Sequence, residues 1–462
     1  MRLGSSLRRA LMEVVGPHHV LEDQELTAGY AIDWTGRFHG RAAAVVRPGS
    51  TAEVAAVLGL LGDAGQPVVP QGGNTGLVGG SVPLHGEVLV SLRRLDQADP
   101  VDRLAAQVTA GAGVTLAALD RHAAAAGLAF GVDLAARDSA TVGGMAATNA
   151  GGLRVLRYGG MRAQVTGVEA VLAGGVVVSH LAGMVRDNTG YDLAGLLTGS
   201  EGTLAVITRL RLRLVPRLSA RAVGLLAFGS TEAALEALAE LIRRVPASLE
   251  AAELFYEPGV DLVCGHLGLS RPFAGTHGAY LLVEAAGVDD PTEDLAAAVV
   301  DGVGDLASDG AVETEPAGRA RLWRYREGHT EAINAAGIPV KLDVALPPAE
   351  LAGFVSRVGE VVAAAAAPAA RCVLFGHAAD GNLHVNVLGA VERAEATEDA
   401  VLRLVASLGG SISAEHGIGT AKRRWLELNR SPAEIGAFRA IKAALDPAGI
   451  LNPHVLLPPE TG

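Results

Sequence analysis

Cysteine is almost absent from this chain of 462 residues. Its two cysteines, Cys264 and Cys372, cannot build a disulfide framework or a four-thiolate metal site, and such sparse usage is typical of a reducing compartment. No run of 18 apolar residues occurs, and the N-terminal residues contain no apolar stretch long enough for a signal peptide. We therefore expect a soluble cytoplasmic protein without a membrane span.

Basic residues and aromatic residues are also in short supply. The 38 lysines and arginines are outnumbered by 50 aspartates and glutamates, and the three tryptophans are too scattered for a base-stacking platform. These features argue against nucleic acid as a partner. The chain also lacks a Gly-x-Gly-x-x-Gly that opens a helix after a first strand, and it lacks a P-loop, which disfavours a nicotinamide Rossmann site and a P-loop kinase.

The residues that are abundant indicate a globular protein with ligand-binding loops. Apolar residues make up 49% of the chain and charged residues 19%, and the length suits two or three domains. Glycine accounts for 59 of the 462 residues, about 13% against a usual value of about 7%. The glycines cluster without a three-residue period, which excludes collagen and favours glycine-rich loops.

The order of the predicted elements divides the chain into three parts. Short strands at 42–46, 67–70, 88–92 and 106–109 alternate with helices, and Ser50 with Glu53 forms a capping-box pattern. Further strands are expected at 165–172, 176–179 and 203–215. From 218 onward, strands at 222–228, 280–284, 341–346, 372–375 and 383–387 mix with helices at 231–243, 317–335 and 348–367, and a last helix spans 432–445. We expect domains at 1–217, 218–430 and 431–462, the second being an antiparallel sheet covered by helices.

Three separate glycine-rich loops follow or connect predicted strands of the first part. They cover residues 71–81, 138–152 and 199–208. Glycine lets backbone N–H groups approach an anion closely, so three such loops favour a long phosphate-bearing ligand threaded through one domain. The alternative is that each loop is only a tight turn.

Several of these segments carry a resemblance to a known family. They are residues 47–54, 70–76, 138–152 with 157–159, 199–208, 380–384 (Asp-Gly-Asn-Leu-His), 414–419 (Ala-Glu-His-Gly-Ile-Gly) and 445–453. The first four resemble the FAD-binding domain of the vanillyl-alcohol-oxidase superfamily. With the last three, the set resembles the FAD-linked D-2-hydroxy-acid dehydrogenases, which include D-lactate and D-2-hydroxyglutarate dehydrogenases and the glycolate oxidase flavoprotein subunit.

The resemblance implies an α+β protein. It would have a two-part FAD-binding domain of the vanillyl-alcohol-oxidase type, an antiparallel-sheet cap domain for substrate, and a C-terminal helical segment that returns to the FAD domain. The residues it implies for FAD binding are Pro70, Gly72, Gly73, Asn74, Thr75, Gly76, Ser81, Ser139, Thr141, Gly143, Gly144, Asn149, Gly152, Glu201, Gly202, Ile207 and Asn452. Some relatives link FAD to a histidine in the first loop. In this chain the first loop and the residues after it contain no histidine before His85, so we expect non-covalent FAD.

Two histidines seven residues apart, His377 and His384, flank a turn between two predicted strands. A hairpin of this kind can bring the imidazoles together, and with Glu415 they would form an open site for a divalent metal. The alternative is a set of separate polar loop residues. The resemblance implies that these three residues bind a metal, zinc in most members, and that His416 is the general base. Since His416 directly follows Glu415 in a glycine-flanked loop, a role as metal ligand stays open.

Cations suited to a carboxylate substrate occur near this cluster. Only three lysines occur, and Lys341 opens an alternating strand where its side chain can point into a pocket. Arg326 and Thr330 lie four apart on one predicted helix, and Arg326 can bind a carboxylate bidentately or lie on a solvated face. The resemblance implies that Arg326, Thr330, Lys341 and Asn386 bind substrate.

These observations lead to one leading hypothesis and two alternatives. We expect an FAD- and metal-dependent dehydrogenase that oxidises a D-2-hydroxy acid, D-2-hydroxyglutarate being the leading substrate, to the 2-oxo acid. The alternatives are a D-lactate or glycolate dehydrogenase and a non-catalytic electron-relay flavoprotein subunit. The electron acceptor (an electron-transfer flavoprotein, a quinone or a cytochrome) and a homodimeric state stay open.

Overall fold

The computed structural model describes residues 3–245 and 248–459, and the chain divides into two compact units. Unit 1 consists of Met1–Gly152, Tyr158–Arg217 and Glu415–Gly462, and unit 2 of Leu153–Arg157 and Leu218–Ala414. The longer segment of unit 2 covers Leu218–Ala414. The domain bounds 1–217, 218–430 and 431–462 stay predictions. None of the helices in the described ranges is long and apolar enough to cross a bilayer.

The smaller sheet of unit 1 has the order β1-β2-β4-β3. Its strands are β1 (Val20–Leu21), β2 (Ala44–Val46), β3 (Val68–Gln71) and β4 (Val88–Ser91), and β4 runs parallel to both β2 and β3. Helix α3 (Thr51–Asp63) connects β2 to β3, which confirms the βαβ pattern. The capping box predicted at its start forms only in part: Ser50 accepts the Glu53 N–H, but the Glu53 carboxylate accepts the N–H of Gly49.

The larger sheet of unit 1 has five strands, and all of its pairs are antiparallel. These strands are β5 (Gln107–Gly111), β6 (Leu128–Phe130), β7 (Val165–Val171), β8 (Val177–His180) and β9 (Val206–Pro216). The long strand β9 pairs with β5, β6 and β7, so it is the centre of the sheet. A buried cluster of aliphatic side chains lies between this sheet and helices α4 (Leu116–Ala124) and α5 (Val142–Thr148).

The remaining helices of unit 1 include several that lack a periodic signal. Helix α5 lies within residues 131–160, a stretch of small residues with little periodicity. The same stretch contains α6 (Val155–Tyr158), whose first three residues belong to unit 2. The others are α1 (Ser5–Val15), α2 (Gln24–Thr27), α7 (Met161–Gln164), α8 (Leu193–Leu197) and α16 (Pro432–Leu445). Helix α16 has the predicted bounds and a complete capping box between Ser431 and Glu434. It belongs to the same unit as the N-terminal elements.

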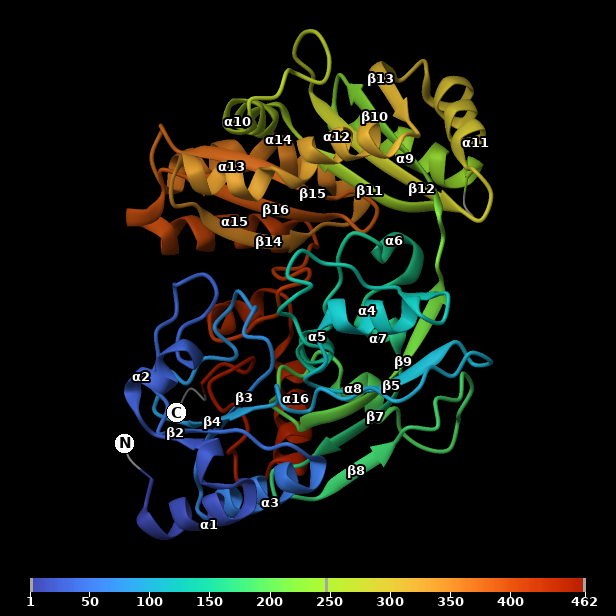
Figure 1. Ribbon diagram of the computed structural model, residues 1–462. Coiled ribbons are helices and arrows are strands. Elements are labelled where there is room, and N and C mark those ends of the chain that lie inside the picture. Colours follow the sequence, from blue (N-terminus) through green and yellow to red (C-terminus); the bar gives the residue numbers. More distant parts are fainter. Residues whose placement is uncertain (1–2, 246–247, 460–462) are drawn as a thin grey trace. The chain divides into compact units, whose positions relative to one another are not determined.

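Unit 2 is built on one seven-stranded sheet with the order β13-β10-β12-β11-β15-β16-β14 (Figure 1). Its strands are β10 (Ala220–Phe228), β11 (Leu249–Phe255), β12 (Ala279–Gly287), β13 (Ala307–Glu313), β14 (Val340–Ala345), β15 (Arg371–His377) and β16 (Asn382–Leu388). Every pair is antiparallel, which confirms the predicted antiparallel sheet.

Helices cover this sheet and complete its core. They are α9 (Thr231–Arg244), α10 (Glu257–Leu267), α11 (Thr292–Ala297), the π-helical turn η3 (Ala298–Val303), α12 (Pro316–Glu327), α13 (His329–Ala336), α14 (Pro348–Ala365) and α15 (Ala394–Ser407). Side chains of α10, α12 and α13 share a buried cluster with β10, β12, β15 and β16. The single helix predicted over 317–335 is wrong, because the chain forms two helices that meet at Gly328.

Candidate active site

The hairpin predicted to carry the two histidines is present. Strands β15 and β16 pair antiparallel, with His377 opposite Asn382 and Phe375 opposite His384. Residues directly opposite in an antiparallel pair point to the same face of the sheet, so both imidazoles lie on one face. Their ring centroids are 5.5 Å apart, and the rings are nearly perpendicular.

A buried carboxylate lies beside the Nδ1 atom of each imidazole. Nδ1 of His377 lies 2.7 Å from Oε1 of Glu253, and Nδ1 of His384 lies 3.4 Å from Oδ1 of Asp343. Both acidic side chains are inaccessible to solvent. The hydrogen-bonded carboxylate of Glu253 fixes the ring orientation of His377 and leaves its Nε2 for a further ligand. Asp343 lies at an ion-pair distance from His384.

The ionised form of Glu253 is stabilised by its neighbours. Burial by itself would raise the pKa of this carboxyl, but the adjacent His377 and Arg326 outweigh burial and hold the pKa below its usual range. Glu253 is therefore a charged partner for His377.

Glu415 offers a third ligand atom beside the two imidazoles. One ligand atom each from His377, His384 and Glu415 lie within 4.8 Å of one another. Two imidazole nitrogens and a carboxylate oxygen are a donor set that suits zinc and leaves a coordination position open. Glu415 directly follows Ala414, the last residue of unit 2.

His416 belongs to a second group of ligand atoms. One atom each from Asp343, His384 and His416 also lie within 4.8 Å of one another. His384 is thus shared by both groups, and His416 lies close enough to it for either role, ligand or base.

Arg326 is buried rather than on a solvated face. Its side chain is only 9% exposed, its Nε donates to Oε2 of Glu253 over 2.7 Å, and its guanidinium carbon lies 4.6 Å from the Phe375 ring centroid. Since the Nε edge is engaged, the guanidinium can bind a substrate carboxylate only through its Nη groups. Neither Nη group donates a hydrogen bond within the part of the chain that the structure describes.

The other predicted substrate residues take different positions. Thr330 lies on α13 and is exposed, whereas Arg326 lies on α12, so the two do not share one continuous helical face. Lys341 is also exposed rather than enclosed in a pocket. It stands opposite Asn386 across β14 and β16, and Asp343 stands opposite His384 in the same pair of strands. Lys341 and Asn386 therefore continue the row that contains His384.

The three glycine-rich loops of unit 1 meet in space. A Cβ atom at Gly73 would lie 2.0 Å from the Ser139 carbonyl oxygen, and one at Gly72 would lie 2.3 Å from Oγ1 of Thr141. Only glycine permits this approach of the first loop to the second. The third loop joins them, because a Cβ at Gly202 would lie 2.7 Å from the Pro70 side chain.

The C-terminal segment closes the same group of loops. The Asn452 amide donates to the carbonyl oxygens of Gly80 and Glu201, each over 2.8 Å. The Glu201 carboxylate in turn accepts the backbone N–H groups of Ile418 and Gly419. Burial raises the pKa of Glu201, although these two hydrogen bonds and Lys422 act in the opposite direction. The Glu201 side chain thus holds a protein loop.

Backbone strain concentrates in the predicted FAD residues. Four of the six non-glycine residues with positive φ in the described ranges belong to this set, namely Asn74 (58°), Asn149 (51°), Glu201 (52°) and Asn452 (44°). Such strain gathers at ligand-binding sites, where the surrounding structure enforces it.

The first loop also presents backbone donors. Within the described residues, no backbone N–H group of residues 72–77 donates to a protein acceptor, and a Cβ at Gly76 would meet no atom within 4 Å. A run of unengaged N–H groups beside open space fits an anionic group such as a pyrophosphate. The loop therefore has the donors that FAD binding requires.

The other predicted FAD residues are held within these loops. Ser81 donates to Oδ1 of Asn74, and Thr141 caps α5 at the N–H of Gly144. Gly143 and Gly152 are close-approach positions like Gly72, and Thr75 follows Asn74 in the first loop. Ile207 is the exception, because its side chain is part of the buried cluster of the larger sheet.

Two family models match the chain. Residues 42–180 match the FAD binding domain, and residues 217–456 match the model described as FAD linked oxidases, C-terminal domain. This chain belongs to the FAD-linked oxidase family. The match confirms the resemblance and establishes FAD as the cofactor of this family's binding domain.

Several named dehydrogenases are similar to this chain over most of its length. A D-2-hydroxyglutarate dehydrogenase of Xanthomonas citri pv. viticola is 39% identical over 92% of this chain and 92% of its own length. The mitochondrial D-2-hydroxyglutarate dehydrogenase of Arabidopsis thaliana is 35% identical over 96% of this chain and 80% of its own length. A Schizosaccharomyces pombe mitochondrial protein, provisionally named D-lactate dehydrogenase, is 36% identical over 92% of this chain and 84% of its own length.

A solved structure shows the same fold at low identity. The crystal structure of p-cresol methylhydroxylase with substrate bound has a TM-score of 0.77 to this chain and is 16% identical, with coverage of 98% of this chain and 96% of that one. This likeness confirms the fold of the vanillyl-alcohol-oxidase type that the resemblance implies.

Three buried polar residues of this chain lie near the two imidazoles but were not predicted from the sequence as site residues. Glu253 is hydrogen-bonded to His377, and Asp343 lies 3.4 Å from Nδ1 of His384. Asn382, 1% exposed, is opposite His377, and its amide atoms make no hydrogen bond within the described residues. The signal for Asp343 was its place two residues after Lys341 in a predicted strand. Glu253 lies in β11, which the sequence did not predict.

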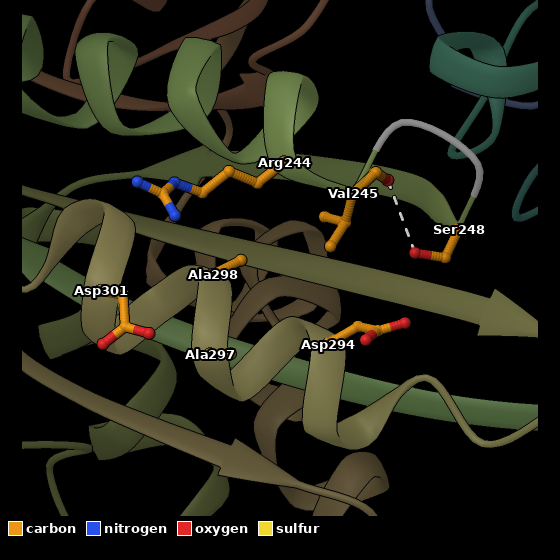
Figure 2. Close-up of a pocket in the computed structure, with 7 residues that line it drawn as sticks. All are labelled: Arg244, Val245, Ser248, Asp294, Ala297, Ala298 and Asp301. Atoms are coloured by element: carbon orange, nitrogen blue, oxygen red, sulfur yellow. Dashed lines mark hydrogen bonds between the residues drawn. The ribbon is translucent and has the colours of Figure 1, made fainter.

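Unit 2 also contains a pocket of about 430 Å³ that is separate from the histidine pair (Figure 2). The side chains of Arg244, Asp294 and Asp301 line it, from α9, α11 and η3. No residue of the predicted catalytic, substrate or metal sets lines this pocket, so we place the candidate active site at the histidine pair.

Proposed function

We propose that this protein is an FAD-dependent dehydrogenase that oxidises a D-2-hydroxy acid to the 2-oxo acid, with D-2-hydroxyglutarate as the leading substrate. The observation that carries the proposal is the pair of imidazoles whose Nδ1 atoms are each backed by a buried carboxylate. Such pairs orient histidines for metal binding. The dehydrogenases that this chain resembles are named for D-2-hydroxyglutarate.

His377, His384 and Glu415 would hold a divalent metal, zinc by the donor set. A bound metal would lower the pKa of the substrate hydroxyl as a Lewis acid, and bound FAD would accept the hydride from C2. Glu253 would keep Nε2 of His377 turned to the metal, and the Asp343 carboxylate lies beside Nδ1 of His384.

The chain's own residues would bind the substrate and move its proton. His416, as a neutral imidazole, would accept the hydroxyl proton. The Nη groups of Arg326 and the ammonium of Lys341 would bind the carboxylates, with Thr330 and Asn386 as further hydrogen-bond partners. A substrate with two carboxylates, such as 2-hydroxyglutarate, uses both cations.

FAD would be bound without a covalent link. Its pyrophosphate would lie against the N–H groups of residues 72–77, beside the loops that contain Ser139 and Gly202. Acid precipitation should release free flavin into the supernatant, and flavin that stays in the pellet would contradict this proposal. We further propose an electron-transfer flavoprotein, a quinone or a cytochrome as the electron acceptor, a homodimeric state, and a cytoplasmic location, the last from the sparse cysteines.

An anaerobic bleaching screen tests the proposed function. D-2-hydroxyglutarate should bleach the oxidised flavin of the holoenzyme, while its L-enantiomer should not. Bleaching by D-lactate in preference to D-2-hydroxyglutarate would support the alternative that the Schizosaccharomyces pombe relative suggests. A yellow protein that no D-2-hydroxy acid reduces would favour an electron-relay subunit and refute the proposal.

A further inference from the structure

A second cluster of metal-ligating side chains lies in unit 1. One ligand atom each from His85, Glu87 and His454 lie within 4.8 Å of one another. The imidazole centroids of His85 and His454 are only 3.9 Å apart, with the rings tilted by 52°. These residues come from opposite ends of the chain and belong to none of the predicted FAD, substrate or metal sets.

The carboxylate at the centre of this cluster lacks a permanent counter-charge. Glu87 is 3% exposed and precedes β4 directly. Its Oε2 accepts the backbone N–H of His85 over 2.8 Å, and its Oε1 lies 3.9 Å from Nε2 of His454. No arginine or lysine forms an ion pair with it among the described residues. A buried carboxylate of this kind is stabilised by a bound cation.

The two imidazoles are suited to coordinate that cation. Their rings lie close together, and a ligand atom of each imidazole lies within 4.8 Å of a carboxylate oxygen of Glu87. Imidazole nitrogen and carboxylate oxygen are both ligands that zinc accepts. The side chain of His454 is 40% exposed, and His85 is exposed, so an ion can enter from solvent.

The backbone around the cluster is held in place. Before His454, Leu451 forms an isolated parallel β-bridge with Val68 of β3. Oγ1 of Thr420 donates a hydrogen bond to the carbonyl oxygen of His454. After His454, the Arg423 side chain donates to the carbonyl oxygen of Leu457. The His454 ring thus faces Glu87 from a segment fixed on both sides.

We propose that His85, Glu87 and His454 form a second divalent-cation site, selective for zinc or a similar metal that accepts imidazole and carboxylate ligands. Two nitrogens and one carboxylate oxygen leave a fourth position for water, and the ion joins the C-terminal segment to the start of β4. Asn452, two residues before His454, contacts Gly80 and Glu201, so the ion also stabilises the loops proposed to bind FAD. The site stands independently of the proposed catalytic metal.

Metal counting with matched variants tests the site. Chelator-treated holoenzyme would be equilibrated with Zn²⁺, freed of unbound metal by gel filtration, and assayed by elemental analysis. The wild type should bind two equivalents, the double variant His85→Gln/His454→Gln one, and His384→Ala one. The combination of all three substitutions should bind none, and His18→Gln/His19→Gln, which alters two neighbouring histidines outside any such group, should bind two.

The outcomes separate this proposal from the catalytic metal. If the wild type and His384→Ala both bind one equivalent that His85→Gln/His454→Gln loses, the second site stands and the catalytic metal does not. If His85→Gln/His454→Gln binds as many equivalents as the wild type, the second site is refuted, and the cluster is only a hydrogen-bonded group. His85→Gln alone, at an exposed position, should weaken zinc binding at this site at least tenfold. In the His384→Ala background, Zn²⁺ should raise the melting temperature only when His85 and His454 are intact.

Discussion

Glu253 and His377 lie next to each other in neighbouring strands, and Oε1 of the carboxylate is 2.7 Å from Nδ1 of the imidazole. The other oxygen, Oε2, accepts the Nε–H of Arg326 over the same distance. One inaccessible carboxylate therefore holds both a proposed metal ligand and a proposed substrate-binding cation.

Glu253→Gln should weaken metal binding by about 10- to 100-fold, since the amide cannot accept hydrogen bonds from His377 and Arg326 at once. Competition with a coloured chelator would measure the affinity. Glu250→Gln is the matched control, because Glu250 is also a buried carboxylate of β11 paired with arginine. An equal loss in both variants would show that Glu253 acts only through general stability.

Arg326→Ala should lower the free energy of unfolding by about 3–5 kcal/mol, because it leaves Glu253 buried without its cationic partner. It should also raise KM for the D-2-hydroxy acid roughly tenfold or more, through loss of a charge-assisted hydrogen bond. Urea titration and initial rates measure the two effects. The double variant Arg326→Ala/Glu253→Gln should regain most of the stability but keep the high KM. A KM that recovers together with stability would show that Arg326 has only a structural role.

His416→Ala should retain FAD and metal and slow flavin reduction by about 10²–10⁴-fold, because the hydroxyl proton loses its acceptor. Stopped-flow absorbance would follow the reduction, and the acidic limb of its pH profile should disappear. A variant that loses metal in proportion to activity would instead identify His416 as a ligand, in the group with Asp343 and His384.

Gly73→Ala and Gly76→Ala should differ in a way that locates the pyrophosphate. A Cβ at Gly73 would collide with the Ser139 carbonyl oxygen, so this variant should lose both thermal stability and FAD. A Cβ at Gly76 meets only open space, so that variant should keep the melting temperature of the apoprotein and bind FAD more weakly. Gly174→Ala, also beside open space, should change neither property. Unchanged FAD affinity in Gly76→Ala would place the phosphates elsewhere.

His329 should make stability fall as the pH is lowered. Burial, followed by the charge of Arg326, lowers the pKa of this inaccessible imidazole to about 3, whereas in the unfolded chain it is 6.5. The unfolded state therefore binds a proton that the folded state does not, so its contribution is complete above pH 6.5 and decreases by about 1.4 kcal/mol per pH unit below it. Urea unfolding at pH 7, 6 and 5 should show this slope, and His329→Leu should reduce it.

The exposed His18 provides the control for this slope. His18→Leu should keep the wild-type pH dependence. If His329→Leu and the wild type show the same decrease between pH 7 and 5, the imidazole at 329 does not govern acid sensitivity.

Local signals in the sequence predicted a large part of the fold. The bounds of α16 follow from Ser431, Glu434 and the proline at its start, and the hairpin of β15 and β16 follows from two apolar runs around a short turn. The helix break at Gly328 was missed, since a glycine inside a helical pattern is tolerated. There a Cβ would lie 2.8 Å from the Leu267 side chain, so packing from another helix requires the glycine.

The sequence by itself determined the family, the glycine-rich loops and the hairpin that brings His377 to His384, because each depends on residues close together along the chain. Only the tertiary structure decided which nitrogen of His377 is engaged, which edge of Arg326 is engaged, and that His85 and Glu87 lie close to His454. Glu253 is 124 residues from His377, and their pairing depends on the order of strands in the sheet. Whether a charge is buried beside its partner depends on such long-range contacts, which periodicity and motif spacing do not encode.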